Sequence, residues 1–230
     1  MDDRVSAIWE EFNHLEVEHR MFRFATTQRG LQANLVAKLG DLYERSVALK
    51  LEVVRSNDED SANALLCLAS VVDAFRSEIL MWLALRDEDA HLAWENLLRA
   101  RDLTRVALQA HLKGKSFESD FERLQMIEHL VFPPQRYTSL GLVAKGSRCS
   151  ICAGEYGECG HVSGRAYMGE LCGRTLTDIE IREISFVFDP ANKHARITAI
   201  SDGGVMRDTL TGEPSSSEES TPRTGTGDSS

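Results

Sequence analysis

Hydrophobic side chains recur at helical spacing through most of the first 130 residues. The pattern predicts five helices, at about 3–24, 27–55, 60–86, 90–112 and 117–131. The third of these is apolar around most of its circumference, so we expect it at the centre of a helical bundle. The pair Pro133-Pro134 cannot continue a helix, and the helical part is therefore predicted to end there.

The predicted helix at 27–55 carries an apolar stripe in alternating steps of four and three, interrupted only by Ser46. Its members are Leu35, Leu39, Leu42, Leu49 and Val53. This spacing is typical of the a/d seam of a coiled coil. The sequence therefore predicts self-association, or binding of a protein partner, through the helical bundle.

The pattern changes after the proline pair, where glycine, cysteine and β-branched residues dominate about 136–208. The stretch Ile179–Phe188 alternates as a strand does, but the alternation slips once. We expect Ile179 and Ile181 on one face of this strand, and Ile184, Phe186 and Phe188 on the other. A turn at 189–192 leads to a second short strand predicted at 195–200.

These patterns predict an α+β fold in three parts. Residues 1–132 form an acidic helical bundle, and residues 133–209 form a small β-rich zinc-binding module. Residues 210–230 have almost no large apolar side chains and cannot offset the entropy of ordering, so we predict a disordered tail.

The net charge of −10 is concentrated in the helical part. Residues 1–132 hold 16 Lys and Arg against 23 Asp and Glu, whereas residues 133–209 hold nine of each. An acidic surface disfavours phosphate backbones, so nucleic acid is not an expected partner.

No membrane association is expected either. The most apolar stretch, 62–85, contains Asp73, Arg76 and Glu78 and fails as a membrane span. The first residues are acidic and amphipathic and lack the apolar region of a signal peptide, so a cytoplasmic location is predicted.

Four of the five cysteines and one histidine fall within 24 positions. They follow the spacing Cys149-x2-Cys152-x6-Cys159-x-His161, with Cys172 eleven positions further on. Such spacing is typical of a zinc site, because thiolate sulfur and imidazole nitrogen are the ligands that zinc prefers. The sequence predicts Cys149, Cys152, Cys159 and His161 as ligands, with Cys172 in place of His161 as the alternative.

Four protein ligands leave no position for water, so the predicted zinc site is structural. The segment 133–209 holds few large apolar groups, and metal binding is expected to supply much of its folding free energy. Cytoplasmic cysteines are normally reduced, which favours metal ligation over disulfides.

The segment Glu183–Asn192, EISFVFDPAN, followed by Ala195-Arg196-Ile197, resembles capsid maturation (prohead) proteases of tailed phages. The preceding CSICAGEYGECGHVSGRAYMGELC resembles zinc-containing relatives of that module, and the resemblance covers about residues 145–200. It implies a small β scaffold and a phage, prophage or phage-response context. Active members use a serine and a histidine, the serine in a G-L-S-x-G-like segment. The nearest counterpart here, Gly169–Gly173, has Cys172 instead.

That departure favours the scaffold without the chemistry, so we expect a non-catalytic binding or assembly protein. A degenerate protease that uses Cys172 and His161 is one alternative. A helical-bundle ribonuclease is another, because such enzymes carry an R-x4–6-H motif. Two pairs fit that spacing, Arg105 with His111 and Arg123 with His129. Each arginine is followed by an apolar residue where the family has a polar one.

The first predicted helix is rich in carboxylates and histidines. They are Glu10, Glu11, His14, Glu16, Glu18 and His19. These side chains are mostly adjacent along the chain and do not converge, so a solvated acidic face is predicted rather than a metal pair.

Overall fold

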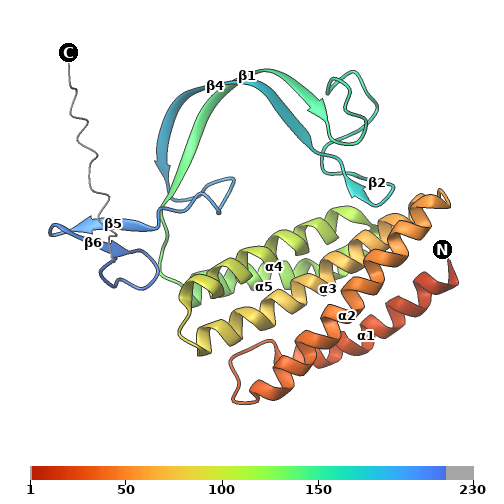
Figure 1. Ribbon diagram of the computed structural model, residues 1–230, viewed down its shortest axis with the longest axis horizontal. Helices are drawn as coiled ribbons and strands as arrows, with labels where there is room; N and C mark the ends of the chain where they lie inside the picture. Colours follow the sequence, from red (N-terminus) through yellow and green to blue (C-terminus); the bar gives the residue numbers. More distant parts are fainter. Residues whose placement is uncertain (1, 216–230) are drawn as a thin grey trace, which may run out of the picture.

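The structure, a computed structural model, describes residues 2–215 and confirms the α+β class (Figure 1). Five α-helices are followed by antiparallel strands. The helices are α1 (Asp3–Phe22), α2 (Arg29–Arg55), α3 (Glu59–Arg86), α4 (Ala90–Ala110) and α5 (Glu118–Val131), with a 3-10 helix η1 (Leu112–Phe117) before α5. Each end lies within two residues of the position that the sequence predicts.

Aspartate side chains cap the N-termini of three helices. Asp2, Asp58 and Asp89 accept hydrogen bonds from the backbone N–H groups of Arg4, Ser61 and Leu92. Each cap satisfies a helix N–H group that has no partner within the helix, which stabilises a helix by about 1 kcal/mol.

Helix α3 lies at the centre of the bundle, as its sequence predicts, and 18 of its 28 residues are buried. The stripe on α2 packs against it: Leu35, Leu39 and Leu42 are at most 1% exposed and belong to the main hydrophobic core. The seam predicted for self-association is therefore covered by the chain's own helices. Within residues 2–215, no helix combines the length and the apolarity that crossing a membrane requires.

The prediction of a solvated acidic face on α1 is wrong for His19, which is fully buried. Its ring stacks on Phe75 with 3.8 Å between centroids, and its Nε2 lies 3.1 Å from the Glu78 carboxylate. Arg123 on α5 pairs with both Glu78 and Asp120. A buried group of ion-paired side chains thus joins α1, α3 and α5.

In the part of the chain that the structure describes, the strands form three separate pairs. The long strands β1 (Tyr137–Cys149) and β4 (Arg174–Val187) make a two-stranded antiparallel ribbon, called the ribbon below. The other pairs are the hairpins β2 (Ala166–Tyr167) with β3 (Glu170–Leu171), and β5 (Ala199–Asp202) with β6 (Val205–Asp208). The strand predicted at 179–188 lies largely within β4, whereas the one predicted at 195–200 is a strand only from Ala199.

A β-bulge explains the slipped alternation in β4. Glu183 pairs with Gly141 and Ile181 with Leu142, so Arg182 is an extra residue with no partner on β1. Because Arg182 adds one residue to β4, the apolar side chains after the bulge point to the same face as those before it. Ile179, Ile181, Ile184 and Phe186 therefore share one face of the ribbon, and the prediction that they divide between two faces is wrong.

The ribbon arches over the helices α3 and α4 (Figure 1). At its near end, Tyr137 is 2% exposed and joins a second hydrophobic cluster with Trp94 and Phe132. At its far end lie the cysteine-rich loop and the β2–β3 hairpin, which returns to the helices (Figure 1). The ribbon is thus attached to the bundle at both ends.

Residues 210–215, which we predicted to begin a disordered tail, contact the β5–β6 hairpin. Leu210 is 8% exposed within the second cluster, and the backbone N–H of Ser215 donates to the Met206 carbonyl. The remainder of the predicted tail, residues 216–230, lies outside the described residues.

Candidate metal centre

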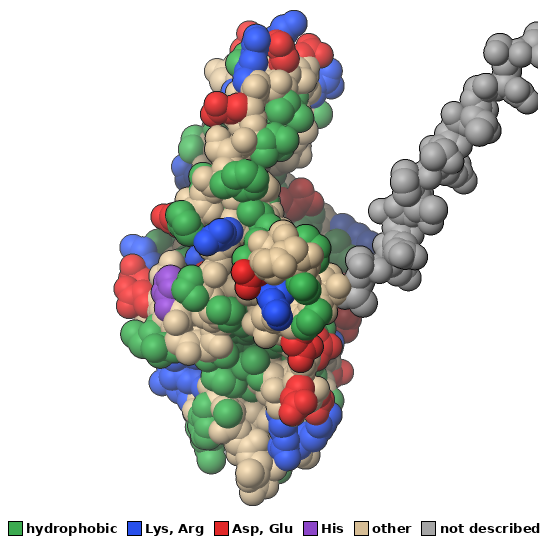
Figure 2. Space-filling view, turned by 90° about the vertical axis from the view of Figure 1, so that its left-hand side faces the viewer, with side chains coloured by type: hydrophobic (Ala, Val, Ile, Leu, Met, Phe, Trp, Pro, Cys, Tyr) green, Lys and Arg blue, Asp and Glu red, His purple; other side chains and the backbone are tan. Residues whose placement is uncertain are grey.

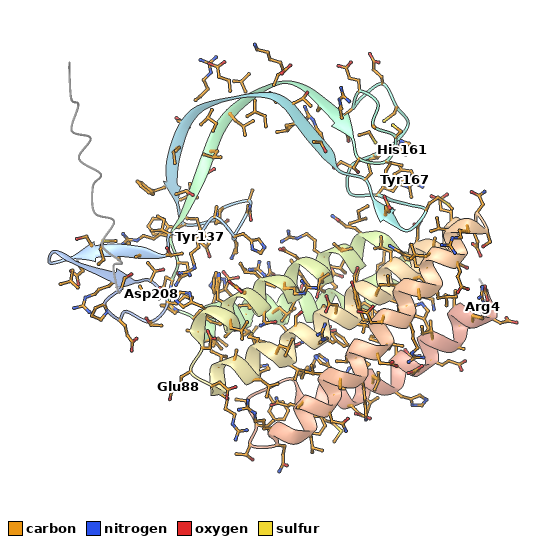
Figure 3. The ribbon with its side chains drawn as sticks, viewed as in Figure 1. Arg4, Glu88, Tyr137, His161, Tyr167 and Asp208 are labelled. Carbon is orange, nitrogen blue, oxygen red and sulfur yellow. The ribbon has the colours of Figure 1, made fainter. Side chains whose placement is uncertain are left out.

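The five candidate ligands come from three segments that meet at the far end of the ribbon. Cys149 is the last residue of β1, and Cys152 follows in the turn after it. Cys159 and His161 lie in the loop that leads to β2, and Cys172 directly follows β3. Figure 3 shows His161 and Tyr167 together at this end, far from Tyr137 at the other.

Four of the five side chains converge. The ligand atoms of Cys149, Cys152, Cys159 and His161 all lie within 4.8 Å of one another. Ligands about 2.0–2.3 Å from a tetrahedral zinc stand about 3–4 Å apart, so a small inward adjustment would bring these atoms to bonding distance. The set can hold one metal ion, and it is the set that the sequence predicts.

The turn between Cys149 and Cys152 aims backbone N–H groups at the first sulfur. The Ile151 N–H donates to Cys149 Sγ at 3.4 Å, and Ala153 adopts a left-handed φ of 57° that closes the turn. The N–H groups of Cys152 and Ile151 lower the pKa of Cys149 to about 6, against the effect of burial. Thiolate is the form of cysteine that binds metals, so this turn favours ligation.

His161 has a nitrogen ready for a metal. Its Nδ1 is buried and has no hydrogen-bond partner, while the ring lies edge-to-face on Tyr167 at 4.7 Å. A buried polar atom without a partner is costly, and a metal ion at the cluster would satisfy it. The unpartnered nitrogen therefore fits an imidazole–metal bond.

Cys172 lies beside the cluster and is almost fully buried. Its Sγ is 3.7 Å from the Cys149 Sγ, close to the sulfur–sulfur spacing of a shared ion. Burial and the neighbouring Cys149 raise its pKa. The choice between His161 and Cys172 as the fourth ligand stays a prediction. No two cysteines form a disulfide, and Cys67 lies apart in the bundle core.

The β2–β3 hairpin anchors the metal centre to the helices. Its turn consists of Met168 and Gly169, both with positive φ, as a two-residue type I′ turn requires. The Gly169 N–H donates to Asn63 Oδ1 at 2.8 Å, and Lys50 Nζ donates to the Gly169 carbonyl at 3.0 Å. Ala166 is buried in the main hydrophobic core. This contact could not be predicted from the sequence, because it joins residues more than 100 positions apart.

One member of each arginine–histidine pair of the ribonuclease alternative has another partner in the structure. His111 lies 3.2 Å from Asp60, and Arg123 is held inside the bundle by Glu78 and Asp120. Both side chains are thus held by residues other than the second member of the pair.

A cavity of about 1090 Å³ lies between α4, α5 and the loop after β4, and Arg105 and His129 both line it. Several of the charged side chains that line the cavity pair with one another. Arg105 and His194 face Asp102 at 3.5 and 2.8 Å, and Arg101 and Lys193 pair with Glu128. Because protein carboxylates already neutralise its cations, the cavity is poorly suited to hold a phosphate.

No family model, curated protein or solved structure matches this chain. The resemblance to prohead proteases stays a prediction that rests on the residues that carry it.

Proposed function

We propose that this protein is a zinc-stabilised, non-catalytic binding or assembly protein. In this proposal zinc closes the far end of the ribbon and holds it above the helical bundle as an interaction surface. The convergence of three cysteines and His161 where the ribbon returns to the bundle carries the proposal. Zinc would supply only a fixed tetrahedral centre, with its chemistry limited to bonds that tie the loop segments together.

The donor set favours zinc over other ions. Three sulfurs and one imidazole make a soft site, which disfavours magnesium and calcium, and a Cys3His set is common for structural zinc. Four protein ligands leave no open position for water or substrate. We infer from this that the centre is structural.

In this proposal the role of zinc is to stabilise the ribbon. An isolated two-stranded hairpin is marginally stable in water, and this one arches over the helices and is attached to them at its two ends. Zinc binding to small sites contributes about 10–16 kcal/mol, which is folding free energy when the site forms only on folding. We infer that the loss of zinc would free the far end of the ribbon and leave the helices folded.

A phage, prophage or phage-response context, and a cytoplasmic location, complete the proposal. The context is supported by the resemblance carried by Glu183–Asn192, and the location by the use of cysteines as ligands rather than in disulfides. Against a cysteine protease, Cys172 is buried and its pKa is raised, and a thiol of this kind is a poor nucleophile.

Metal analysis of the purified full chain tests the proposal. We expect one zinc ion per chain in the wild type and a loss of most of it in Cys152→Ser. Limited proteolysis should then cut the variant between about residues 150 and 165, while the far-ultraviolet circular dichroism of the helices persists.

Cys67→Ala is the matched control, because Cys67 is a cysteine of the bundle core. It should keep its zinc and its protease resistance. A wild-type chain that carries no zinc, or a Cys152→Ser variant with unchanged zinc and unchanged proteolysis, would contradict the proposal.

A further inference from the structure

The ribbon has one polar face and one apolar face. The polar face pairs Ser139 with Ser185, Gly141 with Glu183 and Val143 with Glu180 along its middle. At its ends the same face carries Tyr137 and Cys149, which are buried against the bundle and at the metal centre. The contacts that attach the ribbon therefore use its polar face, and the apolar face is left over.

The apolar face is continuous because of the bulge at Arg182. It is made of cross-strand neighbours, which are Leu140, Leu142, Ile179, Ile181, Ile184 and Phe186. Their exposed fractions run from 38% for Leu142 to 79% for Phe186. A half-buried antiparallel sheet normally turns its apolar face to a core, whereas this face meets no core within residues 2–215. Figure 2 shows hydrophobic side chains along the projecting ribbon.

We infer that this apolar face is the contact between two copies of this chain, packed ribbon against ribbon across a two-fold axis. The inference rests on the proposed function, because zinc is what holds the ribbon in place. An apolar face is complementary to itself, and a two-fold contact uses the same patch on both subunits.

The distribution of charge favours a second copy at this position. The ribbon, residues 137–149 and 174–187, carries four Lys and Arg against three Asp and Glu, whereas residues 1–132 carry a net charge of −7. Two helical bundles would repel each other, but two ribbons are nearly neutral and stand away from the bundles (Figure 2).

The area is sufficient for a specific contact. A large side chain offers on the order of 150–200 Å² when fully exposed. These six are on average a little more than half exposed, so together they present about 500–600 Å². Two copies face to face would remove about 1,000–1,200 Å² from water, which reaches the lower end of specific interfaces. The chain's own residues 216–230 cannot cover the face, because Pro222 is their only apolar residue.

The test measures the mass of the zinc-loaded full chain by light scattering at about 50 µM, above the micromolar dissociation constant that a small interface supports. We expect a particle of twice the chain mass. The double variant Ile184→Ser/Phe186→Ser should raise the dissociation constant at least about tenfold and give monomers. Both side chains are more than 60% exposed, so the substitutions leave the core intact.

Leu112→Ser/Leu130→Ser is the matched control, because its two leucines are 76% and 77% exposed on the helical half. This control should remain a dimer. A wild-type chain that is monomeric with zinc bound would overturn the inference, as would a dimer that survives the ribbon substitutions. Flotation of the zinc-loaded monomer with phosphatidylcholine vesicles would assign the face to a membrane instead.

Zinc content measured on the same samples separates the two ideas. A chain without zinc bears on the proposed function, whereas a zinc-loaded monomer overturns the ribbon contact alone.

Discussion

Cys149 and Cys67 show how the local backbone decides what a thiol can do. Both are buried, but the turn after Cys149 directs N–H groups at its sulfur and lowers its pKa to about 6. Cys67 lies within α3, and burial raises its pKa to about 12. A thiolate is accessible at neutral pH only at the first position, which is the one beside the other ligands.

His161 and Cys172 are alternative candidates for the fourth zinc ligand, and substitutions can distinguish them. Because the His161 Nδ1 is buried without a partner and its ring is held against Tyr167, we expect His161→Ala to weaken zinc binding by at least about 100-fold. Cys172→Ala should weaken it much less. Competition with a chromophoric chelator measures both affinities, and the reverse order would identify Cys172 as the fourth ligand.

The β2–β3 hairpin is the element that fixes the metal centre on the bundle. Gly169 has a φ of +77°, and a Cβ added there would stand 3.2 Å from the Ala62 carbonyl oxygen and 3.0 Å from Lys50 Cδ. Glycine is required at this position for its backbone conformation and for the close approach of α3.

We therefore predict that Gly169→Ala detaches the hairpin from the helices, at a cost of about 1–3 kcal/mol. Hydrogen exchange should accelerate at 166–171 while one zinc ion remains bound. Gly203→Ala is the matched control, because its φ is +57° and nothing lies within 4 Å of the added Cβ. Equal exchange at 166–171 in the two variants would show that the contact with α3 is unimportant.

The packing of α1, α3 and α5 creates a pH-sensitive centre inside the bundle. Burial lowers the pKa of His19, and the adjacent His19 and Arg123 side chains lower the pKa of Glu78 against burial. A group with a lowered folded-state pKa contributes stability above its unfolded value, about 6.5 for histidine and 4.3 for glutamate. That stability is lost as the pH falls through the folded-state pKa.

We predict that the urea midpoint of the bundle decreases as the pH falls from 7 to 5, where unfolded histidine takes up its proton first. His19→Gln should lower stability at pH 7 and flatten this part of the profile. His14→Gln, at an exposed position of the same helix, should keep the wild-type slope. A wild-type slope in His19→Gln would place the titrating group elsewhere.

The five helices and the candidate ligand set could be predicted from patterns local to the chain. Helical periodicity and the proline pair act over a few residues, and so do the spacings that bring Cys149, Cys152, Cys159 and His161 close together. Local signals of this kind can be recognised in a single chain, because the residues that interact are close along it.

Which surfaces remain exposed depends on contacts between elements that are distant in sequence. The pattern of the stripe from Leu35 to Val53 is equally consistent with binding a partner protein and with packing against α3. In the structure it packs against α3. The sequence of α1 predicts an exposed His19, but α3 and α5 enclose it in the structure. The apolar residues of β4 share one face because β4 pairs with β1 and Arg182 forms a bulge, which compensates for the slip in their alternation. Each outcome depends on a neighbour distant in sequence, and one strand's or helix's pattern does not specify that neighbour.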